Sequence, residues 1–135
     1  MRSSPSYGIV WAPINFLLIE ALRKWRRFLG DDFRVECPTG SQTYLNLEEI
    51  ADELSRRFQS LFLKGATAKR AYQAETPRFD EDPAFRDKLQ FFEYFHGDTG
   101  RGCGASHQTG WTAIVAVMLC DTQKPQTETA PQVEH

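Results

Sequence analysis

Two long stretches repeat apolar residues at three- and four-residue spacing, and this periodicity most constrains the fold. The first stretch begins after Pro13 and stops at Gly30, where a proline suits a first helical turn and a glycine suits a helix end. Its spacing places the apolar side chains on one face of an α-helix. That face consists of Ile14, Leu17, Leu18, Ala21, Leu22, Trp25, Phe28 and Leu29.

The second stretch has a clear start at Asn46, with Glu49 three residues later. This is the pattern of a capping box, in which the two side chains bind each other's backbone N–H groups. It predicts a helix that ends near Gly65, with charged residues on its exposed face. The predicted buried face is Leu47, Ile50, Leu54, Phe58, Leu61 and Phe62.

The rest of the chain adds shorter elements. Asp82 and Pro83 predict a short third helix through about Leu89. Residues 110–120 are apolar nearly all round, which is typical of a helix inside a larger body. Residues 33–44 indicate short extended pieces around a turn. We therefore expect an all-α protein of helical hairpins, with a tail over residues 121–135 that is too polar to fold.

Composition narrows the classes of partner. A length of 135 residues fits one domain, and a net charge of −2 favours neither nucleic acid nor an anionic membrane. No apolar run approaches the roughly 18 residues of a membrane span. Arginines and a lysine crowd residues 23–27, which leaves nucleic-acid binding as a weak alternative to a basic helix end. Three cysteines without metal-ligand spacing favour reduced thiols in a cytoplasm.

The stretch from Phe91 to Thr112 carries most of the chemistry. Glycine is costly to order, so five glycines in a polar stretch between apolar runs indicate more than a connection. Glu93 lies among aromatic residues, which suits a general base or acid, and the alternative is a buried glutamate satisfied by a backbone or arginine partner. Histidines in this stretch match no common zinc spacing, so we expect no metal. Trp11 and Trp111 could stack on sugars or simply fill the core.

Three segments together resemble one enzyme family. Residues 11–22 (WAPINFLLIEAL), 92–100 (FEYFHGDTG) and 104–112 (GASHQTGWT) look like the C-terminal part of glycoside hydrolase family 63 and its mannosylglycerate-hydrolase-like relatives. The resemblance implies that residues 1–120 are part of an (α/α)6 toroid with a Gly-rich active-site loop. It also implies inverting hydrolysis of a glucoside or mannoside without a cofactor.

Under this resemblance Glu93 matches the general base. Trp11, Asn15 and Trp111 match positions that line or support the sugar subsite, and His107 and Gln108 lie in the loop over it. The family's general-acid aspartate has no counterpart in this chain. Two further departures are Tyr7 in the place of an arginine and Ile9 in the place of a proline.

The expected function is therefore the C-terminal portion of an inverting glycosidase, inactive by itself. The abrupt start of the helical pattern after Trp11 also indicates a piece of something longer. The alternative is a non-catalytic helical interaction module that associates with itself or with a partner chain through exposed apolar faces.

Overall fold

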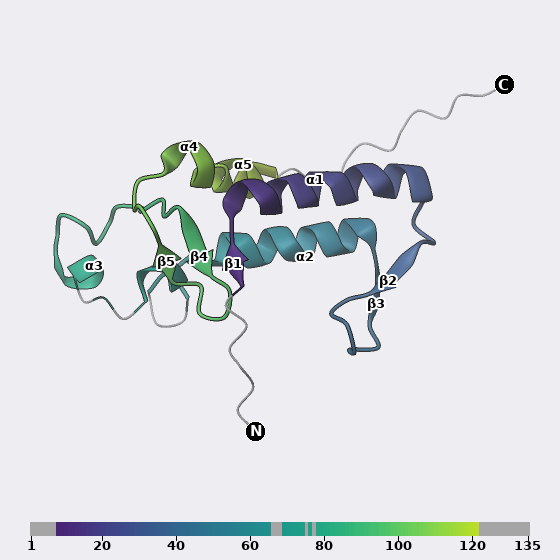
Figure 1. Cartoon of the computed structure of the whole chain (residues 1–135), viewed down its shortest axis with the longest axis horizontal. Helices are drawn as coiled ribbons and strands as arrows, with labels where there is room; N and C mark the ends of the chain where they lie inside the picture. The colour runs from purple at the N-terminus through teal and green to yellow at the C-terminus, as the bar shows by residue number, and fades with distance from the viewer. Residues whose placement is uncertain (1–7, 66–68, 75, 77, 122–135) are drawn as a thin grey trace.

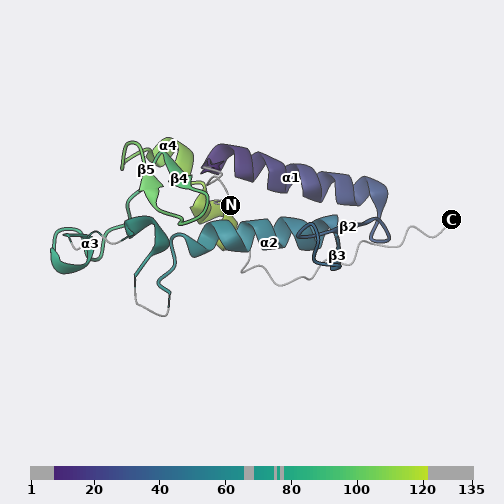
Figure 2. The ribbon, with the colours of Figure 1, turned by 60° about the horizontal axis from the view of Figure 1, so that its bottom comes forward.

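Two long helices lie side by side, with a small antiparallel sheet at one end of the pair and a β-hairpin at the other (Figures 1 and 2). The computed structural model describes residues 8–65, 69–74, 76 and 78–121. The elements in chain order are β1 (Ile9–Val10), α1 (Ala12–Leu29), β2 (Arg34–Glu36), β3 (Tyr44–Asn46), α2 (Leu47–Ser60), η1 (Ala71–Gln73), α3 (Arg78–Glu81), β4 (Tyr94–His96), β5 (Gly102–Cys103), α4 (Thr109–Thr112) and α5 (Val115–Asp121).

The all-α prediction is wrong, and with it the partial (α/α)6 toroid. Strands β1, β4 and β5 form a three-stranded antiparallel sheet, and β2 pairs with β3 in a second sheet. The chain is thus a small α/β domain. Its strands are only two or three residues long, so they carry no alternating pattern that distinguishes them from loops.

Helix α1 begins and ends where the sequence predicts. Pro13 lies in its first turn, and Gly30 ends it with a φ of 79°, where the Gly30 N–H donates to the Arg26 carbonyl at 2.9 Å. Its packing differs from the prediction, because only Ala12 and Ile19 are fully buried. Much of the predicted apolar face is exposed to solvent; these residues are Ile14, Leu17, Leu18, Trp25, Phe28 and Leu29.

Helix α2 has the predicted capping box. The Glu49 N–H donates to Asn46 Oδ1 at 2.9 Å, and the Asn46 N–H donates to Glu49 Oε2 at 2.7 Å. The buried face is turned from the predicted one. Leu47, Phe58 and Phe62 are buried as expected, but Ile50, Leu54 and Leu61 are only half-buried, and their place is taken by Ala51, Ser55 and Gln59.

The first half of the glycine-rich stretch forms a β-hairpin between β4 and β5. Tyr94 pairs with Cys103 and Phe95 with Gly102, while β1 adds to the other edge through Val10 opposite Phe95. Phe95 is fully buried, and its ring packs edge-on against Phe58 of α2 at 5.9 Å between ring centroids. The core therefore joins the sheet to the helix pair.

Three smaller predictions have mixed outcomes. The extended pieces within residues 33–44 are confirmed as the β2–β3 hairpin. The prediction of a third helix from Asp82 to about Leu89 is wrong. Asp82 instead accepts from the Ala84 N–H at 2.8 Å in a turn, and the short helix α3 precedes this turn. The helix after Gly110 is confirmed but broken into α4 and α5. The predicted disorder of residues 122–135 lies outside the described residues, and Asp121 belongs to α5.

Candidate functional site

The two tryptophans singled out in the sequence lie together in the structure. Trp11 immediately precedes α1, and Trp111 belongs to α4, which lies beside the start of α1 (Figure 1). Their ring centroids are 5.5 Å apart and the ring planes meet at 88°, an edge-to-face pair. Each side chain is 40% exposed, so the pair offers aromatic surface to solvent as well as to the interior.

Asn15 supports this pair through the backbone. Its Nδ2 donates to the Trp11 carbonyl oxygen at 2.8 Å, and its own backbone N–H donates to the same oxygen at 3.0 Å. The Asn15 side chain therefore holds the entry of the chain into α1. It fixes the backbone that carries Trp11, which suits a supporting position more than a direct contact.

Glu93 lies at a bend immediately before β4 and is half-buried against the glycine-rich segment. Its N–H donates to the Ala105 carbonyl at 2.9 Å, and the Ala105 N–H donates to Glu93 Oε2 at 3.4 Å. Gly104 adopts a φ of 72° directly beside the carboxylate. One carboxylate oxygen thus faces the backbone of Gly104 and Ala105.

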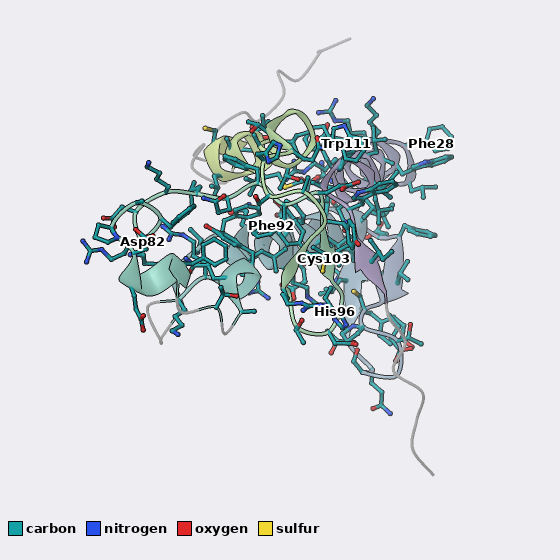
Figure 3. All side chains as sticks on the ribbon, turned by 60° about the vertical axis from the view of Figure 1, so that its left-hand side comes forward. Phe28, Asp82, Phe92, His96, Cys103 and Trp111 are labelled. Atoms are coloured by element: carbon teal, nitrogen blue, oxygen red, sulfur yellow. The ribbon has the colours of Figure 1, made fainter. Side chains whose placement is uncertain are left out.

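A buried hydroxyl connects the carboxylate segment to the tryptophans. Thr112 is fully buried, and its Oγ1 donates to the Phe92 carbonyl oxygen. Thr112 follows Trp111, and Phe92 precedes Glu93, so one hydrogen bond joins the chain neighbours of the two candidate residues. Figure 3 shows Trp111 and Phe92 on this part of the molecule, with His96 at the far end of the hairpin.

His107 and Gln108 lie in the segment that follows. The Gln108 N–H donates to the Phe91 carbonyl at 2.7 Å, and the Gln108 carbonyl accepts from the N–H groups of Trp111 and Thr112 at 3.1 and 3.0 Å. Gln108 therefore starts α4 and sets the position of Trp111 through its backbone. His107 forms an isolated parallel β-bridge with Phe91, and His107 is exposed.

Other chemistry suggested by the sequence lies elsewhere. His96 is at the opposite end of β4, with its Nδ1 4.0 Å from Asp98 Oδ2. Within the described part of the chain, no group of three or more His, Cys, Asp or Glu side chains could hold a metal ion. In the same part, no helix is both long enough and apolar enough to cross a membrane.

The basic cluster at residues 23–27 is engaged with acidic neighbours. Arg23 lies 3.3 Å from Glu20 and 3.2 Å from Asp52, and Arg26 contacts Asp31 at 2.8 Å. Burial lowers the Arg23 pKa, but the hydrogen bonds and charges of its acidic partners outweigh burial, so the net pKa is raised. Two of the basic groups thus already have anionic partners.

Sequence reasoning missed Gly104 and Ala105, which lie against the Glu93 side chain, and Thr112, which bonds the carbonyl of the preceding residue, Phe92. A threonine at the start of an apolar helix gives a weak signal, because its hydroxyl must find an acceptor when buried. Gly104 gave no separate signal, because it is one of several glycines in the stretch.

One curated protein matches a long part of the chain. It is described as "Uncharacterized protein YMR196W" from Saccharomyces cerevisiae and is 51% identical over 116 residues, which cover 84% of this chain and 11% of that protein. The chain thus spans about a ninth of the length of this relative. No family model matches the chain, and no solved structure matches it. The comparisons therefore give no support to the hydrolase and glycosidase assignment, and the strands exclude a six-hairpin toroid.

Proposed function

We propose that this chain supplies the general-base side of a site that hydrolyses a glycosidic bond with inversion. The supporting observation is the Glu93 carboxylate, which accepts from the Ala105 N–H of the glycine-rich loop. The Thr112–Phe92 hydrogen bond links the chain next to Glu93 with the chain next to Trp111, a member of the exposed tryptophan pair. The sequence resemblance to glycoside hydrolase family 63 points to the same residues. The contacts that support the proposal are local, so they do not require the toroid.

Each part of the arrangement has a role in such a reaction. An exposed indole ring can pack against the C–H face of a sugar, which the edge-to-face pair of Trp11 and Trp111 allows. Glu93 would take a proton from water as the water attacks the sugar. Asn15 and Gln108 hold the backbones that carry the two tryptophans. The substrate class is a glucoside or mannoside, and the compartment we propose is the cytoplasm, where unpaired cysteines persist.

The reaction needs a second carboxyl group. Inverting hydrolysis places the acid and the base about 6.5 to 9.5 Å apart, with water between the base and the sugar. We infer that the acid belongs to the remainder of a longer protein, of which this chain is one part, as it matches one part of its yeast relative.

The first prediction concerns the chain alone. Because one carboxyl group cannot serve both roles, incubation with aryl glucosides, aryl mannosides and trehalose should release no sugar. Turnover that disappears in Glu93→Gln would contradict the inference that the acid lies elsewhere.

The second prediction concerns a longer protein that contains this chain. There Glu93→Gln should lower kcat by about 10² to 10⁴, the usual contribution of a general base. Asp98→Asn is the matched control, because Asp98 lies in the same stretch but at the far end of the hairpin beside His96. An equal loss in both variants, or a mild loss in Glu93→Gln, would place the base at another residue.

A second candidate function is a non-catalytic interaction module. Helix α1 carries an exposed apolar stripe, which favours this function because contiguous exposed apolar residues are typical of a contact with another protein. The stripe consists of Ile14, Leu17, Leu18, Trp25, Phe28 and Leu29. Two results together would favour the module over the hydrolase. The chain would associate stably with or without Glu93→Gln, and this substitution would leave the activity of a longer protein unchanged.

A further inference from the structure

We propose that Gly104 and Thr112 are the positioning residues of the Glu93 carboxylate. Gly104 leaves the space that the carboxylate occupies, and Thr112 holds the backbone from which the side chain extends. The catalytic consequence rests on the proposed function, but the positioning itself follows from geometry and can be tested without it.

The argument for Gly104 is one of space and backbone conformation. A Cβ atom at this position would lie 2.5 Å from Glu93 Oε2 and 2.8 Å from Glu93 Cβ. Both distances are far below van der Waals contact, so any side chain here must displace the Glu93 side chain. The φ of 72° also favours glycine, and the next residue, Ala105, provides the N–H that faces the carboxylate.

The argument for Thr112 concerns the residue before Glu93. The Phe92 carbonyl accepts from the fully buried Thr112 hydroxyl, and the Phe92 ring lies over Gly102, where a Cβ would come within 2.3 Å of ring atoms. Phe92 is thus held both by its backbone and by its ring. A residue fixed on both sides leaves its neighbour Glu93 little freedom except in its own side-chain torsions.

Gly100 provides a matched control within the same hairpin. Its φ is 71°, and a Cβ there would lie 2.7 Å from Leu61 Cδ2 and 3.2 Å from Ala71 Cβ. Gly100→Ala therefore introduces similar backbone strain and similar crowding, but against the side chains of Leu61 and Ala71 instead of Glu93. A general loss of hairpin stability would affect both glycine variants alike.

The experiment uses NMR of the 135-residue chain with carbon-13 in the glutamate side chains. Glu93→Gln assigns the Glu93 carboxyl signal, and the contact between the Glu93 side chain and the Ala105 N–H is read from the NOE. Gly104→Ala should shift the carboxyl signal and abolish this NOE, whereas Gly100→Ala should leave both unchanged. An unchanged Glu93 signal in folded Gly104→Ala, or an equal shift in Gly100→Ala, would overturn the role of Gly104.

Thr112 is tested with one variant that is nearly isosteric but lacks the hydroxyl and one variant that keeps the hydroxyl. Thr112→Val removes the donor and should shift the Glu93 signal, while Thr112→Ser keeps the hydroxyl and should restore the wild-type signal. If Thr112→Val and Thr112→Ser give the same Glu93 signal, the hydroxyl does not position Glu93. This pair also keeps the proposal testable if Gly104→Ala does not fold.

Kinetics separate this inference from the proposed function. In a longer protein, Gly104→Ala should lower kcat by about 10²-fold, the effect expected for a misplacement near 1 Å, with little change in KM. A displaced Glu93 in the NMR experiment without any loss of hydrolysis would overturn the proposed function and leave the positioning intact. An undisplaced Glu93 would overturn the positioning and leave the function open to its own test.

Discussion

At the scale of single residues, two phenylalanines of the helix pair illustrate how differently the same side chain can be used. Phe58 of α2 is 3% exposed and contacts Phe62 and Phe95, whereas Phe28 of α1 is 81% exposed. Phe58→Ala should therefore lower the free energy of unfolding by about 3 to 5 kcal/mol. Phe28→Ala should change it by no more than about 0.5 kcal/mol. Urea unfolding followed by circular dichroism measures both, and similar losses would mean that α1 packs differently in solution.

Periodicity could not distinguish these two residues. It assigned Phe28 and Phe58 to apolar helix faces, which is correct, but it does not say whether another element covers a face. The burial of Ser55 and Gln59 was missed for a related reason. Gln59 Nε2 donates to Ser55 Oγ at 2.9 Å and to the Met118 carbonyl at 3.2 Å, so both buried polar side chains have a hydrogen-bond partner inside the core.

In the candidate site, the residue types predicted some members, and others became apparent only from the structure. The types of Glu93, Trp11 and Trp111 were enough to single them out, since carboxylates and aromatic rings have recognisable chemistry. The groups that hold Glu93 are a missing side chain at Gly104 and a backbone N–H at Ala105. Neither has a signature in sequence, because every residue except proline carries an N–H and each glycine lacks a Cβ.

At the scale of elements, the starts of the two long helices were predictable because their signals are local. The capping box of Asn46 and Glu49 involves residues three apart, and the structure contains both of its hydrogen bonds. Asn46→Ala should lower the free energy of unfolding by about 1 kcal/mol, since it leaves a backbone donor of the first turn unpaired. Thermal unfolding measures this loss. Asn46→Asp, which keeps the acceptor, should retain wild-type stability, and a loss as large as that of alanine would show that the cap contributes little.

The pairing of β1 with β4 was not predictable because the two strands are distant in sequence. β1 pairs with β4 across more than eighty residues, with Ile9 opposite His96. Two or three residues per strand offer no period of two, and the glycines around β5 indicate a loop equally well. Phe95 lies in the core, and its extended conformation is set by its pairing with Val10 and Gly102.

At the scale of the whole molecule, the described part of the chain leaves one long helix half uncovered. The helical spacing of Ile14, Leu18 and Trp25 places them on one face of α1, and all three are exposed. Helix α2 runs alongside α1 (Figures 1 and 2). The yeast relative is about nine times as long as the stretch it shares with this chain. We therefore interpret the stripe as a contact surface for further polypeptide, under either proposed function.

This interpretation predicts how the isolated 135-residue chain behaves. Its uncovered stripe should drive association, so sedimentation velocity should show a mass that rises with concentration. Leu17→Gln combined with Leu18→Gln should reduce this association, because both side chains are exposed and their apolar area is removed without opening the core. Leu63→Gln is the matched control, since Leu63 is equally apolar and exposed but lies beyond α2. A chain that stays monomeric at every concentration, or a control that reduces association as much as the double variant, would show that the α1 stripe is not a contact surface.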